Sequence, residues 1–258
     1  MTRPLTGVFV PHRVLKAPRR RPIARGVIAD DLVLVRGLRD TRATLAEWNA
    51  EPWRVVGRWV AFSAAITALL LAAVVLIAEA STPDPTPVVL PGLTAPASVQ
   101  AVVHVLGRNA LVLALHSFAC LAGFIAGSSL PAEAERYGGL WRRVHDRAGP
   151  LAIAFVVAAT TFSLATQAYA LGGAASSLAA QGGISPALLV LGLLPHALPE
   201  LVALFLPLAA WILASRREAW HELMAATLVT TALAIPVLVA AGFVEVYVSP
   251  HVLLWLRG

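Results

Sequence analysis

Five stretches of the chain are long and apolar enough to cross a lipid bilayer as helices, and this feature restricts the possible folds most. About 20 residues of α-helix span the ~30 Å hydrocarbon layer of a membrane. The expected spans are residues 59–77, 105–125, 151–171, 186–214 and 223–248. The composition agrees, because only 13% of the residues are charged, against about 25% in soluble domains. We therefore predict an all-α, polytopic membrane protein, a bundle of five transmembrane helices, which argues against a soluble enzyme and against a nucleic-acid partner.

The basic residues predict how these helices are oriented. Of the 20 basic residues, all but Arg108 and Arg257 lie in three segments, 1–58, 128–148 and 215–222. These segments fall on one side of the membrane if the five spans alternate in direction. Cationic loops remain on the cytoplasmic side, where they resist translocation and meet anionic lipid. We therefore expect the N-terminus inside and the C-terminus outside.

Two regions are expected, a cytoplasmic region over residues 1–57 and a transmembrane domain over residues 58–258. The first 25 residues hold seven basic residues and no acidic one. This basic arm is expected to lie on anionic lipid, at about 1 kcal/mol per charge near the surface, with an acidic protein partner as the alternative. Residues 29–48 predict an amphipathic helix at the membrane surface or against the bundle. Its apolar face would carry Leu34, Leu38, Leu45 and Trp48.

The outer connections are expected to be short. Residues 81–98 are rich in proline and predict an extended spacer, while residues 172–185 are rich in Gly, Ala and Ser and predict a loop. Residues 249–256 are expected at the outer interface, which favours tryptophan. The lone Cys120 excludes an intrachain disulfide, and we expect it to be a small buried residue whose change to serine is silent.

Small residues in the second span predict close helix packing. Gly123 and Gly127 follow Ala119 at intervals of four residues, so the three lie on one face of the helix. Such a series lets neighbouring backbones approach one another.

Polar residues inside the spans need an explanation, because they are costly in hydrocarbon. His196 and Glu200 share one helix face, since they are four residues apart. The prolines of this span remove backbone hydrogen bonds and predict a kink or a helix break at Pro195, Pro199 and Pro207. Under the expected topology, four polar residues lie together in the outer half of the bundle: Asn109, His196, Glu200 and Glu245. His116 lies deeper in the membrane.

Three interpretations of this polar cluster remain open. It is a buried hydrogen-bonded network that sets the bundle geometry, or a proton or ion relay, or a metal or hydrolytic site. The sequence has no HExxH spacing and no convincing Ser or Asp pair for proteolysis. We therefore expect no metal, no cofactor and no enzymatic activity.

The fourth span also carries a family signature. Residues 195–200 read Pro-His-Ala-Leu-Pro-Glu and resemble the Pro-His-Gly-x-x-Glu motif of the stage II sporulation protein M family. Three further features extend the resemblance over residues 100–252. They are Arg108-Asn109 at the start of a helix that ends in glycines, a glycine-rich loop before the motif, and Glu245 followed by Pro250. Ala197 stands where the family has glycine, and Pro199 is an additional proline.

This resemblance implies a multi-pass protein of the bacterial inner membrane. It further implies a non-catalytic component of a complex with peptidoglycan-degrading partners, in sporulation or another form of envelope remodelling. A homo-oligomer is a further expectation. The alternative function is a small transporter or channel subunit that uses the intramembrane His and Glu residues as a proton or ion site.

Overall fold

The computed structural model describes residues 33–129 and 139–257, and within these ranges every regular element is a helix. The long helices are α2 (Val33–Trp48), α3 (Pro52–Ala80), α4 (Val99–Phe124), α6 (Gly139–Gly182), α7 (Pro186–Arg216) and α8 (Leu223–Tyr247). The short ones are the π-helix η1 (Ile125–Ser129), the 3-10 helix η2 (Trp220–Glu222) and α9 (Ser249–Leu256). The predicted all-α fold is confirmed. The basic arm at residues 1–25 lies outside the described residues.

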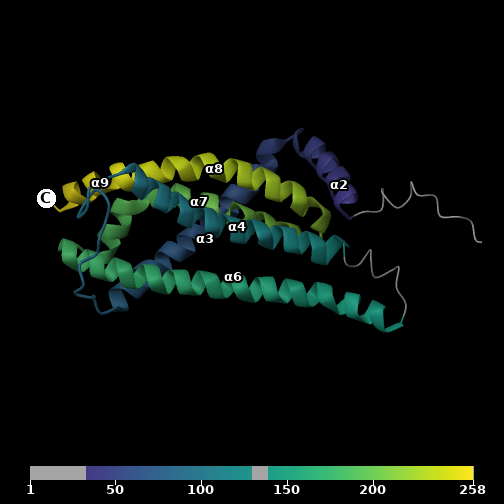
Figure 1. The fold of residues 1–258 in the computed structure, drawn as a ribbon, viewed down its shortest axis with the longest axis horizontal. Coiled ribbons are helices and arrows are strands. Elements are labelled where there is room, and N and C mark those ends of the chain that lie inside the picture. The colour runs from purple at the N-terminus through teal and green to yellow at the C-terminus, as the bar shows by residue number, and fades with distance from the viewer. Residues whose placement is uncertain (1–32, 130–138, 258) are drawn as a thin grey trace, which may run out of the picture.

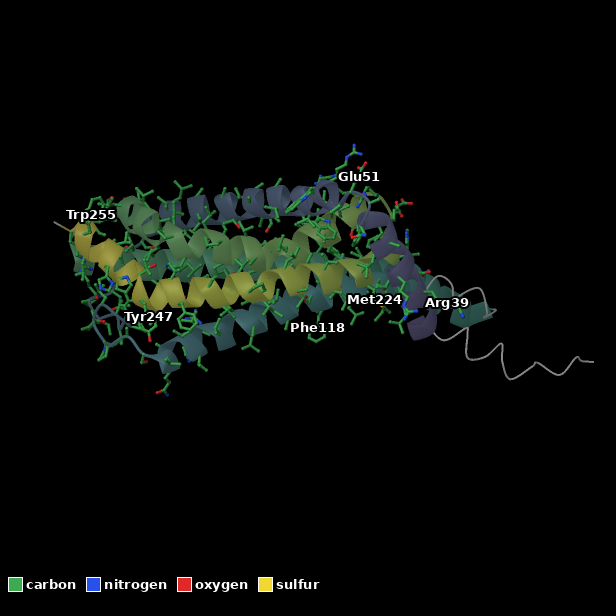
Figure 2. The ribbon with its side chains drawn as sticks, turned by 90° about the horizontal axis from the view of Figure 1, so that it is seen from above. Arg39, Glu51, Phe118, Met224, Tyr247 and Trp255 are labelled. Carbon is green, nitrogen blue, oxygen red and sulfur yellow. The ribbon has the colours of Figure 1, made fainter. Side chains whose placement is uncertain are left out.

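Five helical segments have the length and composition to cross a membrane, which confirms the predicted polytopic architecture. They are Pro52–Ala80, Val99–Gly127, Arg147–Gly182, Pro186–Arg216 and Trp220–Tyr247. In Figure 1 they run roughly along the long axis of the molecule, with α9 at one end and α2 at the other. Figure 2 likewise places Tyr247 and Trp255 at one end and Arg39 and Glu51 at the other, while Phe118 points outward between them.

Helix α7 forms the centre of the bundle. It packs against α3, α4 and α8. In the apolar stretch that could span a membrane, 61% of the α7 residues are buried, whereas only 6% of those of α6 are. A helix that is apolar all round needs protein or lipid on every side, and α7 finds mostly protein. The core around it contains Leu113, Phe124, Phe205, Leu208, Trp211 and Leu223. Helix α6 lies at one side of the bundle and exposes Leu151, Phe155, Phe162 and Tyr169.

Helix α6 is longer than the sequence predicted. The expected outer loop at 172–185 is helical as far as Gly182, and the turn is confined to the residues around Gly183, whose φ is 66°. The prediction was wrong because Gly172 serves helix packing and does not begin a loop. Gly172 lies against Ile77 of α3, where a Cβ would be 2.5 Å from the Ile77 side chain. Small residues of this kind bring membrane helices close together.

The predicted helix break in α7 is also wrong. The helix continues without interruption through its interior prolines, Pro195, Pro199 and Pro207. Each proline removes only one backbone bond, and neighbouring helices surround the remaining turns. Side chains of α3 and α4 hydrogen bond to α7 carbonyls near the last proline: Ser63 to Val202 (2.6 Å), His116 to Leu204 (3.0 Å) and Cys120 to Pro207 (3.0 Å).

The proline-rich connection at 81–98 packs on the end of the bundle where α9 lies. The backbone N–H of Asp84 donates to Ser177 Oγ at 2.9 Å, and that of Val88 donates to Gln181 Oε1 at 3.0 Å. Leu90 and Leu93 pack against the buried cluster between α3, α6, α7 and α9. The connection is extended, as expected, and α6 holds it in place.

Helix α2 contacts the bundle, which is one of the two places expected for it. Trp48 of the predicted apolar face packs edge-on against Trp59 of α3, with ring centroids 5.1 Å apart. Gly37, Thr41 and Thr44 are buried as well, whereas Leu38 of the predicted face is 59% exposed. Met224 and Phe124 lie against Gly37, where a Cβ would be 2.7 Å from the Met224 side chain. A close helix contact of this kind selects small residues.

Candidate functional site

A buried hydrogen bond joins α7 to the start of α9. His196 Nδ1 of α7 lies 2.6 Å from Ser249 Oγ, at the start of α9. One turn deeper, α7 carries Glu200 and α8 carries Glu245. Four residues correspond to ~6 Å of rise along each helix, so the two glutamates fall at the same level of the neighbouring helices. They are close enough to act on each other electrostatically.

Asn109 of α4 faces Glu200. It lies beside the Glu200 carboxyl and is only 8% exposed. Within the described residues, neither Asn109 Nδ2 nor Glu200 Oε2 has a hydrogen-bond partner of normal geometry. A buried polar atom without a partner costs about 1–3 kcal/mol, so the site holds unused hydrogen-bonding capacity.

Arg108 completes the site from the same helix. Its guanidinium acts electrostatically on both Glu200 and Glu245, while the residue itself is exposed. Apart from its place in the family resemblance, Arg108 was expected only as a charge on the outer side. The signal for its role was its position inside the predicted span 105–125, where a long arginine can reach toward the interface. Ser249 was also missed, and its position four residues after Glu245 was the available signal.

The structure therefore brings together three of the predicted cluster residues, Asn109, Glu200 and Glu245, and adds Arg108. His196 lies next to them along α7 and bonds to Ser249 instead.

His116 lies apart from this group, about two turns deeper along α4. It is 1% exposed, its Nδ1 pairs with the Leu204 carbonyl at 3.0 Å, and its ring packs edge-on against Phe205 at 5.5 Å. Nε2 has no partner among the described residues. His116 therefore belongs to the contact between α4 and α7, and not to the group formed by Asn109, Glu200 and Glu245.

The two predicted packing glycines lie where α4 meets the aromatic residues of its neighbours. A Cβ at Gly123 would lie 2.6 Å from Trp211 Nε1, and a Cβ at Gly127 would overlap the Trp220 side chain. Both glycines thus let an indole ring lie against the helix backbone.

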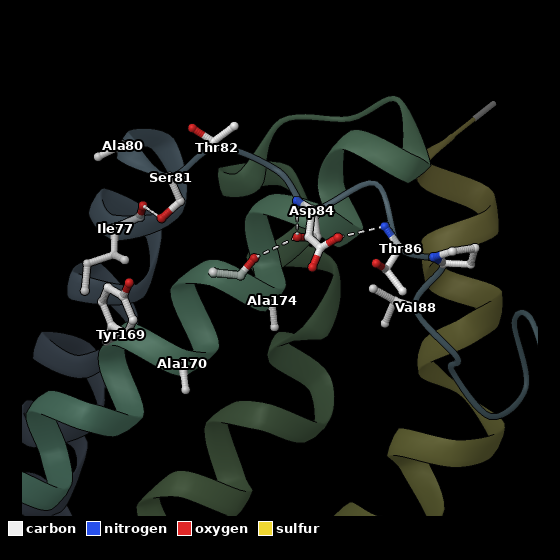
Figure 3. A pocket seen from close by; sticks show the side chains of 13 residues that line it. Ile77, Ala80, Ser81, Thr82, Asp84, Thr86, Val88, Tyr169, Ala170 and Ala174 are labelled. Atoms are coloured by element: carbon white, nitrogen blue, oxygen red, sulfur yellow. Dashed lines mark hydrogen bonds between the residues drawn. The ribbon is translucent and has the colours of Figure 1, made fainter.

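A surface cavity of about 880 Å³ opens at the end of the bundle that carries the connection 81–98, away from the glutamates. It lies between the end of α3, the connection 81–88 and α6 (Figure 3). Its polar rim includes Asp84, which accepts a hydrogen bond from the Thr86 backbone N–H at 2.8 Å. The bonds from Thr86 lower the pKa of Asp84 below its ordinary value of 3.8.

Within the described ranges, no group of three or more His, Cys, Asp and Glu side chains is placed to hold a metal ion. The expected absence of a metal remains a prediction.

The comparison with protein families bears on this region. The model of the family described as Stage II sporulation protein M matches residues 147–250, which include α7, α8 and the residues His196, Glu200 and Glu245. No curated protein and no solved structure matches the chain. The resemblance predicted from the motif at 195–200 is confirmed. This match supports a relationship of residues 147–250 to the stage II sporulation protein M family.

Proposed function

We propose that the protein is a non-enzymatic membrane component, a scaffold or partner subunit, of a bacterial envelope-remodelling complex. The observation that carries this proposal is that polar side chains inside the bundle form hydrogen bonds between helices. Ser63, His116 and Cys120 each bond to a backbone carbonyl of α7, and His196 bonds to Ser249. These bonds hold the helices in a fixed arrangement, as a docking platform requires. The match of residues 147–250 to the stage II sporulation protein M family supports the same role.

The chain is a multi-pass membrane protein, and we place it in the inner membrane with its N-terminus inside. The distribution of basic residues supports this orientation. It also supports contact between the basic arm and anionic lipid. In a Cys120→Ser background, Thr86→Cys should react with a membrane-impermeant maleimide in intact cells, while Glu218→Cys should react only after permeabilisation. The reverse pattern would invert the topology.

A detergent pull-down read by mass spectrometry tests the scaffold function. The wild type should retain specific envelope proteins, above all peptidoglycan-degrading enzymes, and Glu200→Gln should lose them. Glu79→Gln is the matched control, because it makes the same change on an exposed glutamate at the outer end of α3. A folded wild-type protein that purifies alone would contradict the scaffold function, as would turnover of a substrate by the isolated protein.

A second candidate function is a small transporter or channel subunit with an ion or proton site. The unpartnered Asn109 Nδ2 and Glu200 Oε2 beside Glu245 favour it, because polar groups at membrane depth often mark ion pathways. In liposomes, Glu200→Gln and Glu245→Gln should each abolish a pH-dependent flux. A flux that these changes leave intact would remove this candidate.

A further inference from the structure

The group formed by Glu200, Glu245, Asn109 and Arg108, here called the glutamate site, carries an uncompensated charge. Two carboxylates and one guanidinium leave one negative charge when all are ionised. The groups that face Glu200 are Arg108 and Asn109 from α4, Glu245 from α8, and His196 from its own helix. His196 is engaged with Ser249. The charged residues of α3, which also packs against α7, lie toward that helix's two ends: Arg54, Arg58 and Glu79.

An uncompensated charge at this depth needs a counter-ion. Glu200 Oε2 is fully enclosed and lacks a hydrogen-bond partner in the described part of the chain. An isolated carboxylate is costly in such surroundings. Arg108 is exposed and reaches toward the interface, so it neutralises at most one of the two glutamates.

Asn109 provides a second, independent indication of a ligand. Its side chain is more than nine-tenths buried and lies against the Glu200 carboxyl, yet its Nδ2 makes no hydrogen bond of normal geometry with any described residue. A side-chain amide offers an oxygen acceptor as well as two N–H donors, and a half-turn of the amide exchanges them. The same residue can therefore donate to a carboxylate or present a carbonyl oxygen to a cation.

We propose that Glu200, Glu245 and the Asn109 side-chain oxygen bind one small monovalent cation of the Na⁺ type. All three ligands are oxygens, which suit hard cations. A monovalent ion leaves the site neutral, whereas a divalent ion would leave one positive charge in a medium of low polarity. A proton on either carboxylate neutralises the same charge, so protons compete with the cation. The site is that of the second candidate function, but binding does not require transport.

Thermal unfolding of the full chain in detergent, followed by tryptophan fluorescence, tests the proposal. At pH 8 and constant ionic strength, replacing choline chloride by sodium chloride should raise the unfolding temperature of the wild type in a saturable way. Glu200→Gln and Glu245→Gln should each weaken the apparent Na⁺ affinity by about tenfold or more, a loss of about 1.4 kcal/mol for each factor of ten. Glu79→Gln should retain the wild-type response.

Arg108→Gln is the sharpest variant, because its expected effect has the opposite sign. Removing the guanidinium leaves two carboxylates without a fixed positive charge, so Na⁺ should bind more tightly than in the wild type. A folding defect would not produce such a gain. At pH 6, protons should weaken the apparent Na⁺ affinity of the wild type. The proposal is overturned if sodium and choline are equivalent for both wild type and Arg108→Gln, or if Glu245→Gln responds as the wild type does.

These outcomes remain separate from those of transport. Saturable Na⁺ binding without flux in liposomes keeps the site and removes the transporter function. A proton flux in a protein that does not distinguish sodium from choline removes the cation site and keeps the transporter function.

Discussion

His196 Nδ1 of α7 lies 2.6 Å from Ser249 Oγ, the hydroxyl of the first residue of α9. This bond sets the relative position of α7 and the C-terminal end of α8, because Ser249 follows α8 after a single residue. One turn deeper on both helices, the same register places Glu200 beside Glu245. The Pro-His-x-x-x-Glu part of the motif thus combines a residue that aligns the helices with a residue of the glutamate site.

Removing this hydrogen bond should destabilise the bundle. Ser249→Ala leaves the buried His196 ring without its partner, and we expect a loss of about 1 kcal/mol in the free energy of unfolding. Thermal unfolding in detergent measures it. Thr161→Val is the control, since Thr161 is exposed and its hydroxyl bonds only within its own helix. Equal unfolding temperatures for Ser249→Ala and the wild type would contradict a structural role of the bond.

The glycines of α4 allow a direct test of close packing. Gly123→Ala places a methyl group 2.6 Å from Trp211 Nε1, and overpacking of this kind costs about 1–3 kcal/mol. Gly107→Ala is the matched control on the same helix, because nothing lies within 4 Å of its Cβ position. It should raise the stability by about 0.5–1 kcal/mol. Unfolding temperatures that move in the same direction in both variants would show that helix propensity, and not packing, decides the outcome.

Much of the fold could be predicted because hydrophobic length is a local property of the sequence. The five spans follow from it directly, and so does the shared level of Glu200 and Glu245 once neighbouring helices alternate in direction. The extension of α6 to Gly182 could not be predicted, since a glycine-rich segment is helical only when a partner such as Ile77 packs against it. The continuity of α7 through its prolines depends on neighbouring helices in the same way.

The use of single residues could not be predicted because it depends on contacts between helices. The sequence places Arg108 inside the expected span 105–125, but only the packing of α4 on its neighbours lets it act on both glutamates. Likewise, Gly37 and Thr41 are buried while Leu38 is exposed, because the helices that α2 contacts decide which of its residues are covered.

The proline-rich connection should depend on one glycine. Gly92 has φ of 80°, and a Cβ there would lie 2.5 Å from the Val246 carbonyl oxygen. Gly92→Ala therefore combines backbone strain of about 1–2 kcal/mol with a collision against α8. We expect faster cleavage of the connection by proteinase K.

Gly183→Ala is the control for strain alone, because φ is 66° there and nothing lies within 4 Å of the Cβ position. If both variants are cleaved at the same increased rate, the contact between Gly92 and Val246 contributes nothing.

Cys120 should be unreactive in the folded protein. Its side chain is fully buried, and its thiol donates to the Pro207 carbonyl at 3.0 Å. A maleimide should label it only after denaturation in SDS. Cys120→Ser keeps a donor at this position, so the unfolding temperature should change little. Rapid labelling of the native protein would mean that α4 and α7 separate in solution.

Asp84 should make the proline-rich connection sensitive to acid. Its carboxylate accepts the Thr86 N–H at 2.8 Å, and the bonds from Thr86 lower its pKa below 3.8. Because the pKa is lower in the folded connection, the stabilisation is complete above the ordinary pKa and is lost as the pH falls through the lower folded value. Hydrogen exchange at the Thr86 amide, corrected for the intrinsic rate, should therefore show constant protection from pH 8 to about pH 5 and a decline below 3.8. Asp84→Asn keeps an acceptor that does not titrate, so its protection should not decline in this range. If wild type and Asp84→Asn lose protection along the same curve, another acidic group controls the connection.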